Sequence, residues 1–173
     1  VTEYSLSRLI AEIYHLMELK MQEKKLHFSV NVNPELPDRF YGDDVRLRQI
    51  LLNIVNNAYK YTSEGSVVIS CDGSIEGDFA VLHFAVKDTG AGIREEDIKR
   101  LFSEFKRIDE LKNRNVEGSG LGMNIAMQLL VMMDSRLQVE SVYGEGSNFH
   151  FTLRQRIADS RPVGEIRHAL QHT

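Results

Sequence analysis

The chain has 173 residues, a net charge of −4 and a single cysteine, Cys71. Its length suffices for one domain with a substantial core. The acidic balance and the lack of a basic block argue against a nucleic-acid or anionic-membrane surface. One cysteine excludes an internal disulfide framework and a cysteine-rich zinc site. No apolar run reaches membrane-spanning length, and the first residue, Val1, is not a start methionine, so we expect a fragment of a longer protein.

The first two elements are predicted to be a helix and then a strand, from the spacing of their apolar residues. Ser5 or Ser7 can cap a helix that runs to about Lys24, with apolar residues at helical spacing. Residues 26–32 then alternate between apolar and polar side chains, which predicts a half-buried strand. Two prolines follow shortly after and break the chain before the next element.

An aspartate cap at position 43 or 44 starts a long predicted helix that ends near Thr62. Asn is a poor interior helix former, yet three asparagines occupy this helix. At about 100° per residue, Asn53, Asn57 and Lys60 fall on one narrow face, while apolar residues fall on another. The polar face would suit a hydrated metal ion and phosphates, or it is simply the solvent side of an amphipathic helix.

Residues 67–70 and 80–87 are predicted to form two strands of a hairpin, joined by a region that contains glycine. The second strand leads into Asp88-Thr89-Gly90-Ala91-Gly92-Ile93, where two glycines permit a sharp turn and the close approach of a ligand. The Asp88 carboxylate could accept an amine proton there. A plain turn between a strand and a helix is the alternative interpretation.

A short helix is predicted over residues 95–102, followed by a polar segment, 103–119, with little periodicity. So long an irregular stretch is usually functional or mobile, and a cation within it, Arg107, could close over a nucleotide. The segment runs into Gly118-Ser119-Gly120-Leu121-Gly122 at the start of a helix, where backbone N–H groups and the helix dipole attract anions. A dinucleotide-binding motif is excluded because no strand immediately precedes these glycines.

Two more strands are predicted over residues 136–142 and 148–153, with a glycine-containing turn between them. Residues 156–173 look peripheral, as a C-terminal tail or linker. The order of elements, with two hairpin-like pairs, predicts an α/β (α+β) two-layer sandwich. Its mixed, largely antiparallel sheet would have about five strands, covered on one face by about three helices.

Four segments, taken in order, resemble the sequence boxes of sensor histidine kinases. Asn53-x-x-x-Asn57-Ala-x-Lys60-Tyr-Thr resembles the N box, Asp88-Thr-Gly-x-Gly-Ile the G1 box, Phe102-x-x-Phe105 the F box, and Gly118-Ser-Gly-Leu-Gly122 the G2 box. The likeness covers roughly Tyr4 to Leu153, and four boxes in order at suitable spacings are highly specific. It implies a Bergerat ATP-binding fold of the GHKL superfamily, with MgATP under a flexible lid at about 103–119.

The resemblance implies which residues contact the nucleotide. By this likeness Asn57 would hold Mg²⁺, and Asp88 would bond the adenine amino group. Asn53 and Lys60 would approach the phosphates, and Arg107 would contact the terminal one, so Lys60 and Arg107 are the candidate catalytic residues. The full set of implied nucleotide-binding residues is Asn53, Asn57, Lys60, Tyr61, Asp88, Gly90, Gly92, Ile93, Phe105, Arg107, Gly118, Ser119, Gly120, Leu121 and Gly122.

The phosphoacceptor segment of the family, a helix bearing His followed by an acidic residue, is missing. His15 lies on a predicted helix but is followed by Leu16, so we interpret it as an ordinary helix residue. Residues 1–25 therefore look like a connecting helix after an absent dimerisation and phosphoacceptor domain. They would pack as part of the ATP-binding catalytic domain at 26–155, with residues 156–173 as the tail.

The resemblance implies transfer of the γ-phosphoryl group of ATP to a histidine on a separate phosphoacceptor domain of the same or the dimer-partner chain. A response regulator receiver domain would be the next acceptor, with no nucleic-acid partner. We expect this fragment to be monomeric and cytoplasmic, to bind ATP and to lack autophosphorylation. We expect the full-length protein to be a homodimer, with or without a membrane anchor.

A nucleotide-sensing pseudokinase and a hydrolytic GHKL ATPase remain alternatives. The residue at position 53 argues against the hydrolytic ATPase. Hydrolytic relatives carry at this position a Glu that activates water, whereas the amide of Asn53 cannot take a proton.

Overall fold

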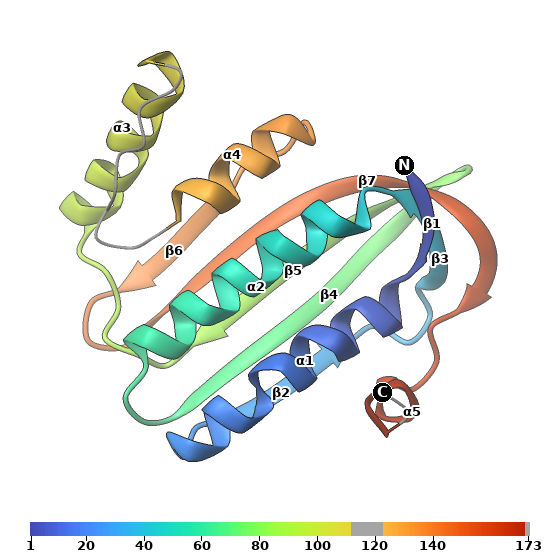
Figure 1. Ribbon diagram of the computed structural model, residues 1–173, viewed down its shortest axis with the longest axis horizontal. Coiled ribbons are helices and arrows are strands. Elements are labelled where there is room, and N and C mark those ends of the chain that lie inside the picture. Colours follow the sequence, from blue (N-terminus) through green and yellow to red (C-terminus); the bar gives the residue numbers. More distant parts are fainter. Residues whose placement is uncertain (112–122, 172–173) are drawn as a thin grey trace.

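The computed structural model describes residues 1–111 and 123–171, which form a sheet with helices on one of its faces (Figure 1). Within these residues the strands are β1 (Thr2–Ser5), β2 (His27–Val32), β3 (Pro37–Gly42), β4 (Ser66–Glu76), β5 (Phe79–Asp88), β6 (Gln138–Val142) and β7 (Gly146–Pro162). The helices are α1 (Leu6–Glu23), α2 (Asp44–Tyr61), α3 (Glu95–Leu111), α4 (Asn124–Met132) and α5 (Ile166–Gln171). None of the described helices is long and apolar enough to cross a bilayer.

The seven described strands form one sheet in the order β1-β3-β7-β5-β4-β2, and β6 also pairs with β7. The pair β2–β4 is parallel, whereas the other described pairs are antiparallel. The first part of β7 lies between β5 and β6, and its later residues pair with β3. The predicted two-layer sandwich with a mixed, largely antiparallel sheet is therefore confirmed.

Helices α1 and α2 begin at side chains that the sequence predicted as caps. The Ser5 hydroxyl accepts a hydrogen bond from the backbone N–H of Arg8 at 3.2 Å, at the start of α1. The Asp43 carboxylate accepts one from the backbone N–H of Arg46 at 3.0 Å, at the start of α2. Each cap satisfies an N–H group that has no partner within its own helix.

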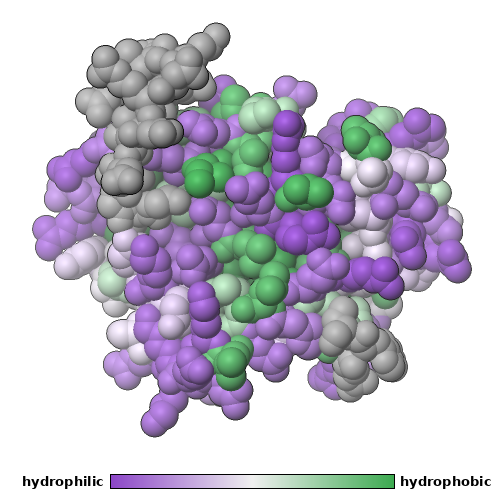
Figure 2. All heavy atoms as spheres, viewed as in Figure 1, coloured by the Kyte–Doolittle hydropathy of each residue, from purple (hydrophilic) through white to green (hydrophobic). Residues whose placement is uncertain are grey.

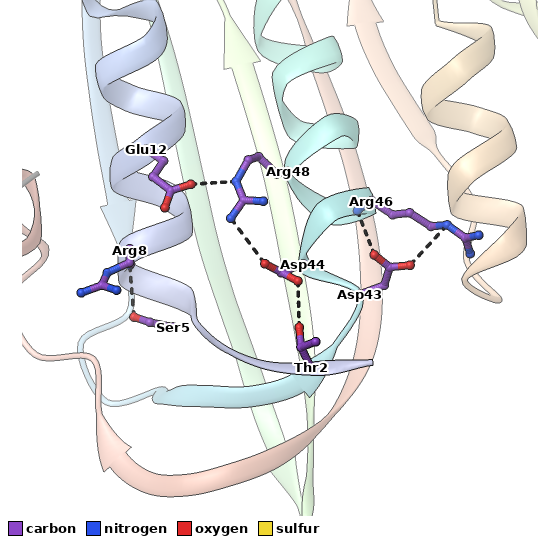
Figure 3. A network of polar contacts seen from close by, with 8 residues as sticks. All are labelled: Thr2, Ser5, Arg8, Glu12, Asp43, Asp44, Arg46 and Arg48. Atoms are coloured by element: carbon purple, nitrogen blue, oxygen red, sulfur yellow. Dashed lines mark hydrogen bonds and ion pairs between the residues drawn. The ribbon is translucent and has the colours of Figure 1, made fainter.

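A polar network joins the start of β1 to the first halves of α1 and α2 (Figure 3). We call it the α1–α2 network, and its members are Thr2, Glu12, Asp44 and Arg48. The Arg48 side chain donates to Glu12 of α1 at 2.7 Å and lies 3.5 Å from Asp44. The Thr2 hydroxyl donates to the same Asp44 carboxylate at 3.0 Å. These contacts fix the relative placement of the two helices at one end of the sheet.

The core lies between the helices and the sheet. The apolar face predicted for α2 is buried as expected; it comprises Leu47, Ile50, Leu51, Ile54 and Ala58. It packs in one hydrophobic cluster with the inward residues of β4, β5 and β7, such as Phe84 and Phe151. Figure 2 shows that the outer surface of this side of the molecule is mostly polar, with apolar patches in its middle. Residues 47–58 thus use one helix face for the core and leave the asparagine face for another role.

The sheet has more strands than the sequence predicted, because β1 and β3 were missed. β1 is only four residues long, and β3 starts with Pro37 and continues with the charged residues Asp38 and Arg39. Proline is acceptable at the first residue of a strand, but it argues against a strand when only the sequence is considered.

Two regions are also more regular than expected. Residues 103–111, assigned from sequence to the irregular lid, continue α3 as a helix, while the rest of that segment lies outside the described residues. Residues 156–162, expected to belong to a tail or linker, continue β7 and pair with β3. α5 follows and packs near α1, where the backbone carbonyl of Leu170 lies 2.7 Å from a ring nitrogen of His15. The boundary of the domain itself stays a prediction.

Candidate functional site

A cavity of about 360 Å³ opens where the C-terminal half of α2 meets the end of β5, the start of α3 and the β6–β7 turn. Its lining residues are Asn57, Tyr61, Asp88, Gly92, Ile93, Arg94, Asp97, Arg100, Leu101, Glu104, Tyr143, Ser147 and Phe149. Segments far apart in the sequence thus meet around one hollow of the size that small-molecule ligands occupy.

Asn57 contributes the α2 side of this cavity and is only 6% exposed. Its Oδ1 has no hydrogen-bond partner among the described residues, and neither has Oδ1 of Asn53 one turn earlier. A buried polar atom without a partner costs about 1–3 kcal/mol, so such an atom calls for an explanation such as a ligand. Mg²⁺ prefers oxygen ligands, and the Asn57 amide oxygen therefore suits a magnesium ion.

The rest of such an ion's coordination would not come from a protein cage. Within the described part of the chain, no group of three or more His, Cys, Asp and Glu side chains could hold a metal ion. Mg²⁺ in phosphoryl-transfer sites usually keeps waters and takes few protein ligands together with the phosphates of the substrate. The donor set around Asn57 fits an ion that arrives with a nucleotide.

Asp88 is the last residue of β5 and presents a buried carboxylate to the cavity. It accepts a hydrogen bond from the backbone N–H of Gly90 at 2.9 Å. Burial raises the pKa of this carboxyl, while the backbone N–H groups of Gly90 and Ser147 and the side chain of Thr62 lower it by a smaller amount. A carboxylate with oxygen lone pairs facing a cavity can accept a hydrogen bond from an exocyclic amine.

The two glycines after Asp88 let the backbone pass close to neighbouring segments. Gly92 has φ of +70°, which side chains rarely adopt, and a Cβ there would collide with the Val142 carbonyl. A Cβ at Gly90 would collide with the Tyr61 carbonyl and approach Asp88 Oδ1 at 2.9 Å. The backbone N–H of Ala91 donates to that Tyr61 carbonyl at 3.1 Å. The loop is thereby held against both α2 and the β6–β7 turn.

Some of the predicted site residues do not line this cavity. Asn53 lines a separate shallow hollow between α1 and α2, and Lys60 is exposed outside the cavity lining. Phe105 lines a third hollow, between α3 and α4, together with Phe102. Arg107 lies within α3, and its side chain is not among those described. Gly118, Ser119, Gly120, Leu121 and Gly122 lie outside the described residues.

Other lining residues were missed by sequence reasoning. Arg94 directly precedes α3 and Arg100 lies in it, within the short helix predicted at 95–102, and no motif marked either arginine as a site residue. Tyr143 and Ser147 come from the β6–β7 turn, interpreted from sequence only as a connection. No sequence signal marked these two residues, because Ser147 reaches the site only through the pairing of β7 with β5, in which it lies opposite Asp88.

Comparison with known proteins agrees with this geometry. Residues 42–157 match the family described as histidine kinase-, DNA gyrase B-, and HSP90-like ATPase. The peroxide stress-activated histidine kinase mak2 of Schizosaccharomyces pombe is 35% identical over 88% of this chain, and the autoinducer 2 sensor kinase/phosphatase LuxQ of Vibrio cholerae is 38% identical over 87%. The chain spans only 7% and 18% of the lengths of these two relatives.

Solved structures give the same result. Full-length ShkA in complex with AMPPNP superposes with a TM-score of 0.73 at 30% identity, over 91% of this chain and 32% of that one. The catalytic domain of histidine kinase ThkA, in a nucleotide-free form, superposes with a TM-score of 0.69 at 25% identity, over 88% of this chain and 93% of that one. The chain belongs to the histidine kinase-, DNA gyrase B-, and HSP90-like ATPase family, as the ATP-binding catalytic domain of a sensor histidine kinase.

Proposed function

We propose that this domain binds MgATP in the cavity and transfers the γ-phosphoryl group to a histidine on a separate dimerisation and phosphoacceptor domain, of the same or the dimer-partner chain. A response regulator receiver domain is the next acceptor. The observation that carries the proposal is the meeting of Asn57, with its unpartnered buried Oδ1, and the buried Asp88 carboxylate at one cavity. The kinship with an AMPPNP-bound structure supports the same ligand class.

Each end of the nucleotide has a matching group in this arrangement. Asp88 accepts a hydrogen bond from the adenine amino group, because its carboxylate is buried at the end of β5 and faces the cavity. Asn57 Oδ1 is the protein ligand of Mg²⁺. Tyr61, one helical turn further on, also lines the cavity. Lys60, which is exposed, and Arg107 approach the phosphates when the nucleotide is in place.

The transfer step needs positioning and charge neutralisation rather than covalent chemistry by the protein. The bond between the γ-phosphorus and its bridging oxygen breaks as a phosphorus–nitrogen bond forms to the acceptor imidazole, ADP leaves with the bond's electron pair, and the imidazole releases its N–H proton to solvent. The magnesium ion supplies charge neutralisation on the phosphates. Asn53 stands one turn before Asn57 and cannot act as a base at neutral pH, so this chain lacks a water-activating group at that position.

Calorimetric titration with ATP, in the presence and absence of Mg²⁺, tests the proposal. Asn57→Ala is expected to remove the Mg²⁺-dependent part of the affinity, with a loss of about tenfold or more, because even changes to the partners of metal ligands cost about ten- to a hundredfold in metal affinity. Asn56→Ala, which changes an exposed asparagine next to it on the same helix, is the matched control and leaves affinity unchanged. Equal Mg²⁺-dependent affinity in Asn57→Ala and wild type contradicts the assignment.

Mixing the chain with its phosphoacceptor domain and MgATP then separates the kinase from its two alternatives. Phosphohistidine on the added domain supports phosphotransfer. ATP binding without transfer supports a nucleotide sensor, and steady phosphate release without any acceptor supports a hydrolytic ATPase.

A further inference from the structure

Arg94 and Tyr143 meet at the mouth of the nucleotide cavity, although one precedes α3 and the other follows β6. The Arg94 guanidinium lies 4.4 Å from the centre of the Tyr143 ring, a cation–π contact. Both residues line the cavity and both remain largely exposed, at 55% for the Arg94 side chain and 59% for Tyr143. The pair therefore presents a flat cationic and aromatic surface that the fold itself leaves uncovered.

The backbone beneath the pair is held by hydrogen bonds between its two segments. The N–H of Gly144 donates to the Ala91 carbonyl at 2.7 Å, and the N–H of Ile93 donates to the Ser141 hydroxyl at 2.7 Å. Gly92 packs so closely on the turn that an added Cβ would lie 2.9 Å from the Cα of Tyr143. The surface is thus already placed before any ligand enters, which lowers the entropic cost of binding.

The position of the pair relative to Asp88 indicates which part of a nucleotide it would meet. The turn that carries Tyr143 leads into β7, where Ser147 pairs with Asp88. A Cβ at Gly146 would collide with the Asp88 carbonyl, so turn and strand end are in direct contact. Asn57, the candidate Mg²⁺ ligand, lies on α2 more than one helical turn before Thr62, the residue at the end of α2 that reaches Asp88. Arg94 and Tyr143 therefore lie on the Asp88 side, where the base is expected.

Resting on the proposed function, we propose that Arg94 and Tyr143 form a stacked wall that packs against the purine base and sets part of the affinity for the nucleoside portion of the ligand. Aromatic rings and guanidinium planes both stack on nucleobases, and such stacking contributes about 1–3 kcal/mol per base. Three apolar residues also line the cavity and suit a flat heterocycle: Ile93, Leu101 and Phe149.

The wall contacts only the base, so its removal lowers the affinity for ADP, AMP and adenosine by the same factor. Titration of the 173-residue chain with each of these ligands is the test. Arg94→Ala and Tyr143→Ala are each expected to lower affinity by about five- to tenfold for all three ligands. The double variant loses less than the product of the two single losses, because the residues act as a stacked pair. Tyr143→Phe keeps the ring, so it is expected to lose less affinity than Tyr143→Ala, although it removes the hydroxyl that bonds the Arg94 side chain.

Arg154→Ala is the matched control. The exposed Arg154 lies 3.8 Å over the ring of the half-buried Phe79, and this cation–π pair is absent from the cavity lining. The loss of Arg154 leaves nucleotide affinity unchanged. An affinity loss in Arg94→Ala that grows from adenosine through AMP to ADP overturns the wall, because it shows a phosphate contact. Unchanged affinity in Tyr143→Ala also overturns it. Failure of the wild-type chain to bind any of the nucleotides refutes the proposed function itself, which is a separate outcome.

Discussion

The two halves of α2 use polar side chains in opposite ways. Near its start, Asp44 and Arg48 are fully engaged with partners on β1 and α1 in the α1–α2 network. Further along, Asn53 and Asn57 have buried amide oxygens without partners among the described residues, and of these two Asn57 lines the nucleotide cavity. Paired polar groups maintain a fold, whereas unpaired buried ones cost stability and are kept where a ligand supplies the missing partner. The helix therefore separates a structural end from a binding end.

The largest effect is expected from Asp88→Asn, which tests the binding end. The amide presents one acceptor and one donor group where the carboxylate presents two acceptors, so the hydrogen bond from the adenine amino group loses its charged acceptor. Hydrogen bonds to charged groups contribute about 1.5–3 kcal/mol, so ATP affinity is expected to fall by roughly ten- to a hundredfold in a calorimetric titration.

Asp72→Asn is the control for this change, because Asp72 is an exposed aspartate on the neighbouring strand β4, bonded to Asn33. It should bind ATP as wild type does. If Asp88→Asn binds ATP as tightly as the control, Asp88 does not recognise the base.

A smaller effect, and one on stability alone, is expected from Arg48→Ala at the structural end. The variant removes the bonds to Glu12 and Asp44, and because all three side chains are partly exposed the free energy of unfolding should fall by only about 1 kcal/mol. Urea denaturation measures this loss, and calorimetry should show unchanged ATP affinity. A marked loss of ATP affinity in Arg48→Ala would remove the distinction between the two halves of α2.

The smallest effect concerns the pH dependence of stability without nucleotide. Because burial raises the pKa of Asp88 in the folded chain, the folded state binds more protons than the unfolded state in the acidic range. The contribution of Asp88 to the free energy of unfolding is therefore most favourable below its unfolded pKa, and declines as pH rises through its folded pKa.

Asp88→Asn should accordingly be slightly more stable than wild type at neutral pH, with the difference vanishing in acid. Urea denaturation of both proteins across the acidic range to neutral pH measures it. If the difference in free energy of unfolding between the two proteins is constant over this range, burial does not raise the pKa of Asp88.

The sequence predicted α2 well because both of its signals are local. An aspartate cap and a 3.6-residue apolar repeat need no tertiary information, and the structure has Asp43 as the cap and the expected residues buried. The same repeat did not decide which asparagine reaches the cavity. Residues four apart drift by about 40° around a helix, so Asn57 and Tyr61 turn toward β5 while Asn53 faces the hollow beside α1.

The parts that sequence could not predict depend on distant partners. Tyr143 joins the site only because β6 and β7 pair and carry their turn against Gly92, a contact between residues far apart in the chain. The sequence of β3 alone predicts a loop, and the segment is a strand because β1 and β7 pair with it on either side. The polar second half of β7 is likewise a strand because of its partner and not because of its composition.

The place of β7 in the sheet has a consequence for how the chain reaches its folded state. β7 is the last strand of the described chain, yet it lies between β3 and β5 and pairs with both. During synthesis the earlier strands emerge first, and the edges of β3 and β5 stay unpaired until residues 146–162 arrive. Such long-range pairing is slow, and open edges invite association with other chains. Truncation before Gly146 should therefore produce an aggregation-prone chain rather than a smaller stable domain.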